Sequence, residues 1–450
     1  RMYLHMNNRL FSRNDLVRLI IPLIVDQFLQ VAVGLSDSIM VARVGEAAVS
    51  GVSLVDTVML LIINIFTALA TGGAVIAGQY LGRKDPKTGC EATAQLFNFT
   101  FLFSIFIMIL GYLGQNVILY HVFGKIEPEV MKDSRTYLLI VLSSIPMIAM
   151  YNAGAAIFRA MGNSNIAMKT SLLMNSINVF GNALLIFGFH RGVEGVAIPT
   201  VVSRGVACVV ILILLNNQKH ELHILHPYPF KIKWNVLKKI LYIGIPNGLE
   251  NSMFQLGKLA IQSSVSTLGT VAIAAQAMTS ILENLNGIAA IGVGVGLMTI
   301  VGQCIGAGRK DEAVYYIKKL CMIAEVILII SCLSVFVLTK PITILGGMEK
   351  ESADMCIHMT MWITIVKPLV WIMAFIPGYG MRAAGDVKFS MLTSCTTMCL
   401  CRFCLSVFMI RVVGVGAMGV WIGMFSDWTL RGIIFSWRFH SRKWLKHQVI

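Results

Sequence analysis

The chain has 450 residues, of which 56% are hydrophobic and 13% are charged. A soluble domain carries about 25% charged residues, so this composition excludes an ordinary soluble protein. The formal charge of +15 could suit a nucleic-acid partner. However, the basic residues lie in short loops between apolar runs and form no patch. The sequence therefore predicts a membrane protein without a nucleic-acid partner.

Apolar runs recur along the whole chain at the length that a bilayer requires. A transmembrane helix needs about 20 consecutive apolar residues. We therefore predict an all-α polytopic membrane protein with twelve transmembrane helices. The predicted spans are 16–43, 48–80, 92–119, 134–160, 166–188, 192–216, 237–266, 271–305, 312–339, 353–381, 387–411 and 414–437.

The distribution of basic residues predicts the orientation of these spans. One set of loops carries most of them, including Arg83, Lys84, Lys231, Lys233, Arg309 and Lys310. The opposite set carries Arg43, Lys125, Lys132, Arg191, Lys340, Lys350 and Arg411. Because cytoplasmic loops carry the excess of Lys and Arg, we expect the first side to be cytoplasmic. Both termini would then face the cytoplasm from the plasma (inner) membrane.

The two halves of the chain resemble each other in a fixed register. One constant offset relates the pairs Pro22 and Pro246, Asp26 and Glu250, Gly45 and Gly269, Gly72 and Gly296, and Gln79 and Gln303. Further on, Arg159-Ala160-x-Gly162 matches Arg382-Ala383-x-Gly385 at an offset that is shorter by one position. The repeat predicts an N-terminal lobe over 1–215 (six helices), a cytoplasmic linker over 216–236, and a C-terminal lobe over 237–450 (six helices and a basic tail).

Six is an even number, so the second copy should enter the membrane from the same side as the first. Such parallel repeats are related by an axis along the membrane normal and occur in secondary transporters that work by alternating access. The sequence contains no Gly-x-x-x-x-Gly-Lys-[Ser/Thr] stretch, so it carries no ATP motor of the Walker type.

Two aspartates lie within the first apolar run, and ionisable groups inside a membrane are usually functional. The second of them, Asp37, is expected at the same depth as Asn178, Asn182 and Thr200, between the midplane and the outer leaflet. One carboxylate with amide and hydroxyl oxygens can hold a small hard cation. It can equally hold a protonatable aspartate. The simple structural alternative is a set of unrelated polar pairings between helices.

The first aspartate, Asp26, and its repeat mate Glu250 each follow a proline by four residues. Pro22 and Pro246 should kink their helices. We expect Asp26, Glu250, Gln255 and Lys258 to line a substrate cavity, where the carboxylates would attract cationic drugs. The alternative for Glu250 is an ion pair with Lys258, two turns further on. Further charges inside apolar runs are Asp56, Arg204, Glu283, Glu325, Lys367, Arg402 and Asp427.

Several motifs together resemble one family. They are Leu35-Ser36-Asp37-Ser38-Ile39-Met40, Asn178-Val179-Phe180-Gly181-Asn182, Gly192-Val193-Glu194-Gly195, and the repeated Arg-Ala-x-Gly motif at Arg159 and Arg382. With the paired halves, this set resembles the multidrug and toxic-compound extrusion (MATE) transporters over nearly the whole chain. The resemblance implies twelve helices in two lobes and efflux driven by entry of sodium ions or protons.

The resemblance also implies a site for the coupling cation in the N-terminal lobe. In the archaeal and bacterial members that the chain most resembles, the site would fall on Asp37, Asn178, Asn182 and Thr200, with Na⁺ at the first three. The family often has aspartate where this chain has Asn182. Loss of that charge should weaken sodium binding or favour proton coupling. Another branch couples through an acid at the position of Phe254, so that role does not transfer.

We therefore expect a secondary antiporter, without enzymatic activity or cofactor, that exchanges organic, often cationic, compounds for Na⁺ or H⁺. Its partners would be small molecules and membrane lipid, and it would be a monomer. The alternative is a related flippase for lipid-linked oligosaccharides. A membrane-embedded enzyme is disfavoured, because the sequence has no His-Glu-x-x-His or Gly-x-Ser-x-Gly. We interpret Cys401-x-x-Cys404 as buried packing thiols rather than a metal site. The histidines at 220, 223 and 226 are likewise expected to lie in a solvated loop and not to bind a metal.

Overall fold

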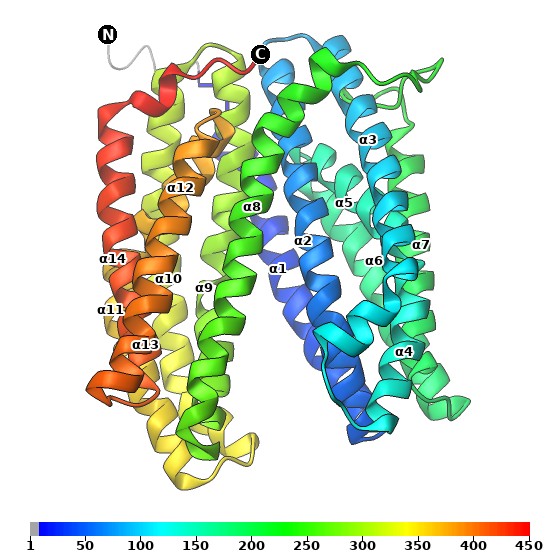
Figure 1. Cartoon of the computed structure of the whole chain (residues 1–450). Coiled ribbons are helices and arrows are strands. Elements are labelled where there is room, and N and C mark those ends of the chain that lie inside the picture. Colours follow the sequence, from blue (N-terminus) through cyan, green and yellow to red (C-terminus); the bar gives the residue numbers. More distant parts are fainter. Residues whose placement is uncertain (1–8) are drawn as a thin grey trace. The chain divides into compact units, whose positions relative to one another are not determined.

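The computed structural model describes residues 9–450, which form helices and the connections between them, with no strand among these residues (Figure 1). These residues form two compact units. The first, which we call the N-lobe, comprises Arg13–Gly248 and Ile450. The second, the C-lobe, comprises Leu249–Val449 together with residues 9–12. The prediction of an all-α fold is confirmed.

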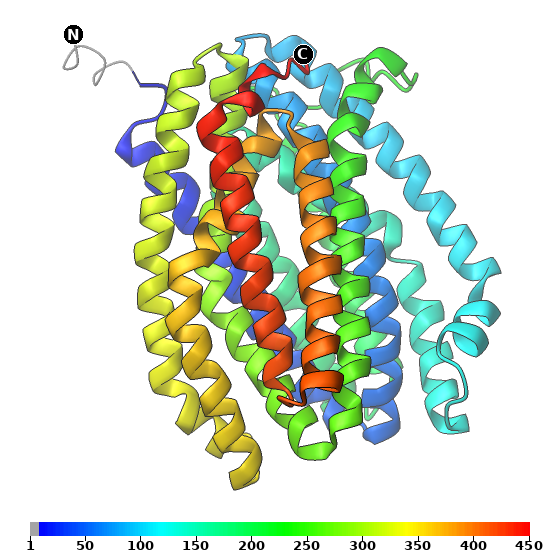
Figure 2. The same ribbon diagram turned by 60° about the vertical axis from the view of Figure 1, so that its left-hand side comes forward.

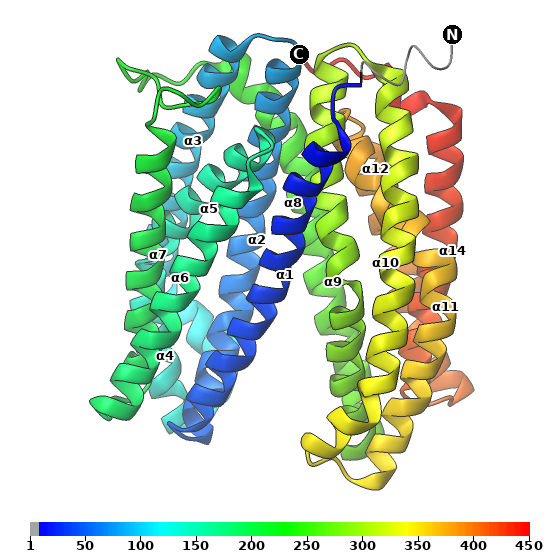
Figure 3. The same cartoon turned by 180° about the vertical axis from the view of Figure 1, so that it is seen from behind.

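The N-lobe contains seven complete helices and the first part of an eighth. They are α1 (Arg13–Ala42), α2 (Glu46–Gly82), α3 (Pro86–Leu113), α4 (Pro128–Leu142), α5 (Ile145–Ala160), α6 (Ser164–Ala183), α7 (Glu194–Leu215) and the start of α8 (Trp234–Val265), with π-helical turns η2 (Val117–Val122) and η3 (Leu184–Gly188). In Figure 3, α1 runs the length of this lobe, and it packs against α6 and α2. A cluster of apolar side chains around Val55, Phe66 and Leu138 forms a core between these helices.

The C-lobe contains the remaining part of α8 and six further helices. They are α9 (Thr270–Gly306), α10 (Lys310–Leu345), α11 (Lys350–Ala383), α12 (Val387–Thr397), α13 (Ser406–Phe408) and α14 (Met418–Ser441), with η4 (Ser266–Leu268), η5 (Met398–Leu405), η6 (Met409–Val413) and η7 (Lys443–Lys446). Within this lobe α11 packs against α9, α10 and α14. Figure 2 shows α14 beside the run formed by α12, η5 and α13.

Each of the twelve predicted spans coincides with a helical stretch, although the ends differ by several residues. Among residues 9–450, nine helices are long and apolar enough to cross a membrane, or ten if the bent pair α4 and α5 is one span. The two remaining long helices are α8 and α14, with 32 and 24 residues. Each carries buried charged groups, namely Glu250 on α8 and Asp427 and Arg431 on α14.

Two local features differ from the simple expectation of continuous spans. The span predicted over 134–160 is broken between α4 and α5, where the chain bends by 51°. Pro22 and Pro246, by contrast, lie inside helices that continue through them, α1 and α8. A kink at each proline stays a prediction.

The boundary between the two packed units falls inside α8, beyond the predicted linker. The first part of α8 lies directly on α2: a Cβ on Gly72 would be 2.7 Å from the carbonyl oxygen of Ile240 and 2.9 Å from the amide nitrogen of Gly244. The chain between α7 and α8 is also hydrogen-bonded to α3. By packing, both segments therefore belong to the N-lobe, whereas the predicted limits 1–215, 216–236 and 237–450 describe the repeat in the sequence.

Candidate functional site

The four residues predicted to hold the coupling cation lie together in the N-lobe. Asn178 donates its Nδ2 to Oδ2 of Asp37 over 3.0 Å, and Asn182 donates its Nδ2 to Oδ1 over 2.9 Å. The Thr200 hydroxyl lies 3.3 Å from Oδ1 of Asn178 and 2.9 Å from the carbonyl of Val196. Helices α1, α6 and α7 therefore contribute to one polar cluster, which we call the Asp37 cluster. Its role in transport stays a prediction.

The spacing on α6 explains why two amides reach the same carboxylate. Asn178 and Asn182 are four residues apart, so they lie one above the other on the same helix face. Both are buried, and Oδ1 of Asn182 has no hydrogen-bond partner among the described residues. Oδ1 of Asn178, by contrast, is engaged by Thr200. Two amides therefore donate to the carboxylate, and the amide oxygen of Asn182 remains without a hydrogen-bond partner in residues 9–450.

Further charged and polar residues surround the Asp37 cluster. Arg204 on α7 interacts electrostatically with both Asp37 and Asp56, and it donates NH1 to the Ser144 hydroxyl over 2.8 Å. Asp56 on α2 accepts a hydrogen bond of 3.0 Å from the Tyr137 hydroxyl. One guanidinium therefore acts electrostatically on both carboxylates. The sequence marks Asp56 and Arg204 as charges inside apolar runs, but no spacing signal assigns them to Asp37.

Asp26 belongs to a separate cluster nearer the other end of α1. It interacts with Ser171 and Arg159, and it accepts a long hydrogen bond of 3.5 Å from Gln30. The C-lobe has an equivalent cluster around Glu250. There, Ser394 donates its hydroxyl to Oε1 over 2.7 Å, and Arg382 lies 3.9 Å from the same atom.

These two clusters, which we call the carboxylate clusters, occupy matching positions of the internal repeat. Asp26 and Glu250 are related by the main offset of the repeat. Arg159 and Arg382, like Ser171 and Ser394, are related by the offset that is shorter by one position. The repeat therefore includes the polar partners as well as the helices. The expected alternative for Glu250 is wrong, because its ion pair is with Arg382. Lys258, two turns away on the same helix, is about 12 Å along the axis.

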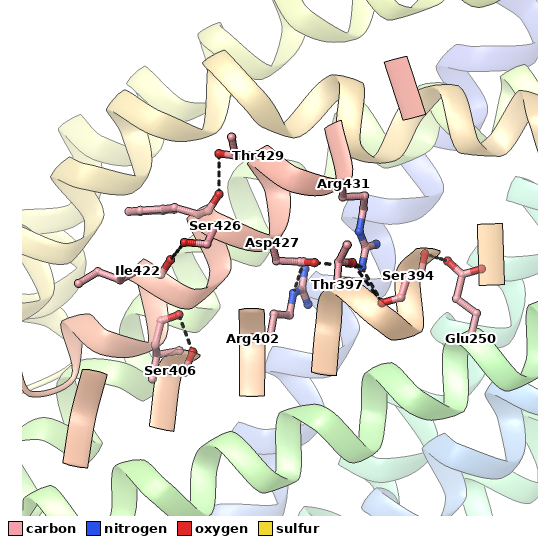
Figure 4. A network of polar contacts seen from close by, with 12 residues as sticks. Glu250, Ser394, Thr397, Arg402, Ser406, Ile422, Ser426, Asp427, Thr429 and Arg431 are labelled. Atoms are coloured by element: carbon pink, nitrogen blue, oxygen red, sulfur yellow. Dashed lines mark hydrogen bonds and ion pairs between the residues drawn. The ribbon is translucent and has the colours of Figure 1, made fainter. Parts of the chain in front are cut away.

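A buried network continues from Glu250 across the C-lobe (Figure 4). Nε of Arg402 donates to Oδ2 of Asp427 over 2.6 Å, and Arg431 lies 3.5 Å from the other oxygen of that carboxylate. Arg431 also reaches the carbonyl of Ser394 over 3.4 Å. All three charged side chains are nearly inaccessible to solvent. The partner that Arg402 requires is therefore Asp427, and sequence analysis did not single out Arg431.

Phe254 lies at the position where another branch of the family that this chain resembles has an acid. In this chain its ring packs against the two arginines of the buried network. The Arg402 and Arg431 guanidinium groups lie 5.1 and 4.9 Å from the centre of its ring. Such cation–π contacts help to compensate desolvated cations. A second buried pair joins Lys367 to Glu283 over 2.8 Å and to Asn286 over 2.6 Å.

The remaining predicted cavity residues are more accessible. Gln255 is half-buried and Lys258 is exposed on α8, and their contact with a substrate stays a prediction. Within residues 9–450 no group of three or more His, Cys, Asp or Glu side chains is placed to hold a metal ion. The Asp37 cluster lies outside that definition, because it offers one carboxylate, two amides and a hydroxyl.

Comparisons with known proteins agree with the repeat. The model of the family described as MatE matches residues 22–184 and 246–408, two segments in the main register of the repeat. The chain is 24% identical to "Probable multidrug resistance protein NorM" of Thermotoga maritima (strain MSB8), over 97% of this chain and 94% of that protein. It is 25% identical to "Uncharacterized transporter YisQ" of Bacillus subtilis (strain 168), over 94% of this chain and 93% of the relative.

A solved structure has the same fold. It is described as the outward-facing conformation of a multidrug resistance MATE family transporter of the MOP superfamily. The TM-score is 0.89 at 19% identity, and the alignment covers 95% of this chain and 96% of that one.

Proposed function

Because the chain belongs to the MatE family of transporters, we propose that it is a secondary antiporter that exports organic, often cationic, compounds in exchange for Na⁺ or H⁺. The family membership and the apolar helices make it a multi-pass membrane protein of the multidrug-efflux type. The antiport mechanism, the coupling ion and the substrate class are the proposed part. The flippase alternative is not favoured, since NorM is named as a multidrug resistance protein.

The observation that carries the proposal is the Asp37 carboxylate, which accepts two amide hydrogen bonds inside a membrane-spanning lobe. When ionised, the carboxylate accepts both N–H groups, which ties α1 to α6. A proton at Asp37 neutralises the carboxylate, and a sodium ion compensates its charge. Either change weakens the hydrogen bonds from the two amides. The tie between α1 and α6 then weakens, and the outer half of α1 can shift. We propose that this shift changes the lobe cavity and releases the substrate outward.

Both candidate ions require the same rearrangement of Asn182. A protonated Asp37 needs an acceptor, and a sodium ion needs oxygen ligands. The amide nitrogens of Asn178 and Asn182 face the carboxylate, and only Oδ1 of Asn182 is unengaged. Rotation of the Asn182 amide would present this oxygen to either ion. We therefore propose Asp37 and Asn182 as the ion-responsive pair, with Asn178 and Thr200 in support.

For the substrate cavity we retain Gln255 and Lys258, and we reassign the two carboxylates. Each of the two interacts with an arginine and a serine of its own lobe. These partners compensate Glu250 more fully than Asp26, whose Oδ1 is buried without a hydrogen-bond partner among the described residues. We propose that both carboxylates stabilise the lobes.

By the positive-inside rule we further propose a plasma-membrane location, with both termini and the linker in the cytoplasm. We also propose a monomeric state.

The test is dye export by protein reconstituted into vesicles, under an imposed sodium gradient and separately under an imposed proton gradient. We expect one of the two gradients to drive export. Asp37→Asn should abolish that export while the protein remains in the vesicle membrane at the normal level. Asp354→Asn, which changes an exposed aspartate on α11, is the matched control. Wild-type export by Asp37→Asn would remove Asp37 from the mechanism.

A further inference from the structure

The N-lobe has a pocket beneath the chain that joins α7 to α8. We call residues 216–233 of this connection the linker segment; Figure 1 shows it running beside α3. The pocket has a volume of about 440 Å³ and is lined by parts of α3, α5, α7 and the linker segment. Its walls include Phe97, Phe101, Met150 and Leu212. The volume falls within the range of about 300–1,000 Å³ that small-molecule sites occupy.

The polar lining groups of the pocket are already occupied with one another. Asn98 and Tyr228 are the only polar residues among the nine that line it. The Tyr228 hydroxyl donates to Oδ1 of Asn98 over 2.7 Å, and Nδ2 of Asn98 donates to the carbonyl of Pro229 over 2.8 Å. The hydroxyl proton of Tyr228 and one N–H of Asn98 are thus used within the pocket wall, and the other seven lining residues are apolar. The pocket therefore suits an apolar occupant, such as a hydrocarbon chain.

The linker segment is held over this pocket by a row of polar side chains on α3. Gln95, which is buried, donates Nε2 to the carbonyl of Lys231 over 3.0 Å and accepts from the amide of Lys233 over 2.9 Å. Glu91, one turn away on α3, lies 3.9 Å from Nζ of Lys233. These contacts fix the backbone of the two lysines beside Phe230, which lines the pocket.

Residues 230–234, which begin at the pocket wall, alternate between apolar and basic side chains. Phe230, Ile232 and Trp234 are 81%, 41% and 61% exposed, and the intervening Lys231 and Lys233 are exposed as well. Aromatic side chains are enriched at the membrane–water interface. Lysines at that depth attract anionic headgroups. Since Glu91 partly compensates Lys233, Lys231 provides the less compensated of the two charges.

We propose that this pocket binds an acyl chain of an anionic phospholipid from the leaflet on the linker side, with the lipid phosphate at Lys231 and Lys233. The exposed aromatic side chains would lie at the headgroup level around it. A cationic drug fits the same place poorly, because it would meet two lysines and, among the residues that line the pocket, no carboxylate. The lipid would stabilise the linker segment against α3, at the point where the chain passes from one half of the repeat to the other.

Native mass spectrometry of the intact protein can test this proposal. Phosphatidylglycerol and phosphatidylcholine with identical acyl chains would be added to the delipidated protein. We expect one phosphatidylglycerol to bind about tenfold more tightly than phosphatidylcholine, as two lysines near a phosphate predict. The double variant Lys231→Gln/Lys233→Gln should lose this preference. Lys340→Gln/Lys350→Gln, which neutralises two exposed lysines elsewhere, should keep it.

A second pair of variants tests the acyl-chain pocket itself. Leu102→Trp places a large side chain at the pocket wall, whereas Leu113→Trp makes the same change at an exposed position further along α3. We expect the first to lose the tightly bound lipid and the second to retain it. The proposal would be overturned by equal binding of the two lipids to the wild type. Unchanged lipid binding in the lysine variant or in Leu102→Trp would also overturn it.

Discussion

Asn182 donates its amide to Oδ1 of Asp37 over 2.9 Å, while the oxygen of the same amide is buried without a hydrogen-bond partner among the described residues. A buried polar atom without a partner costs about 1–3 kcal/mol. Rotation of the amide would relieve this cost only when Asp37 can donate or when a cation lies between them. The pair therefore has two arrangements whose balance depends on the charge of Asp37. This dependence is the property that a coupling site requires.

The first prediction concerns the charge at this position. Asn182→Asp would place a second carboxylate within hydrogen-bonding distance of Asp37. Two unit charges about 4 Å apart interact by about 4 kcal/mol at an effective dielectric constant of 20, so the apparent affinity for the coupling cation should rise by at least about tenfold. Cation-dependent dye export in vesicles measures this affinity. Asn175→Asp, which adds a carboxylate elsewhere on α6, should leave it nearly unchanged. Equal affinities for Asn182→Asp and the wild type would contradict the proposed pair.

The second prediction concerns the carboxylate clusters. Glu250→Gln would leave Arg382 without its nearby carboxylate, but would keep an oxygen for Ser394. If the cluster stabilises the C-lobe, the apparent unfolding temperature should fall. Export of cationic and of neutral dyes should then decrease by the same factor. Asp354→Asn serves again as an exposed control. A selective loss of cationic dyes at normal thermal stability would instead return Glu250 to the substrate cavity.

Sequence reasoning was most successful where contacts repeat at a fixed spacing. The constant offset between pairs such as Pro22 and Pro246 predicted the two matching halves, and the four-residue spacing of Asn178 and Asn182 predicted a shared helix face. The same reasoning could not pair Arg402 with Asp427, because the two residues come from different helical stretches and no spacing relates them. It also placed the limit of the N-terminal half in the linker. The close approach of α2 and α8 at Gly72, which holds the start of α8 on the N-lobe, depends on tertiary packing.

The third prediction concerns the buried ion pair of the C-lobe. Asp427→Asn would leave Arg402 and Arg431 without a shared carboxylate in a site that excludes water. Removal of one partner of a buried pair typically costs about 3–5 kcal/mol. The double variant Asp427→Asn/Arg402→Met should recover part of that loss, because it removes one of the uncompensated cations. Thermal unfolding of the three proteins in one detergent measures both effects. A double variant that is no more stable than Asp427→Asn alone would contradict this prediction.

The fourth prediction concerns pH and the docking of the linker segment. Burial raises the pKa of Tyr228 to about 12, from about 10 in an unfolded chain. The folded protein therefore retains a proton that the unfolded chain releases between these values. The contribution of this group to stability is complete below about pH 10 and is lost as the pH rises towards 12. The stability difference between the wild type and Tyr228→Phe should change over this range. Tyr120→Phe, at an exposed position, should track the wild type.

The last prediction concerns the contact between α2 and α8. A Cβ at Gly72 would meet backbone atoms of Ile240 and Gly244 at 2.7 to 3.0 Å, and backbone cannot move aside as a flexible side chain can. Gly72→Ala should therefore destabilise the protein by about 1–3 kcal/mol, as overpacking does. Gly78→Ala is the matched control on the same helix, because its Cβ would meet only the Ala160 side chain at 3.9 Å.

The control should be neutral or stabilising by about 0.5–1 kcal/mol, since alanine favours a helix interior. Thermal unfolding compares the two variants, and limited proteolysis at the linker segment reports whether the start of α8 has separated from α2. Equal stability of the two variants would mean that α8 yields at this contact. In that case the packing of α2 against α8 could not be the reason that the first part of α8 belongs to the N-lobe.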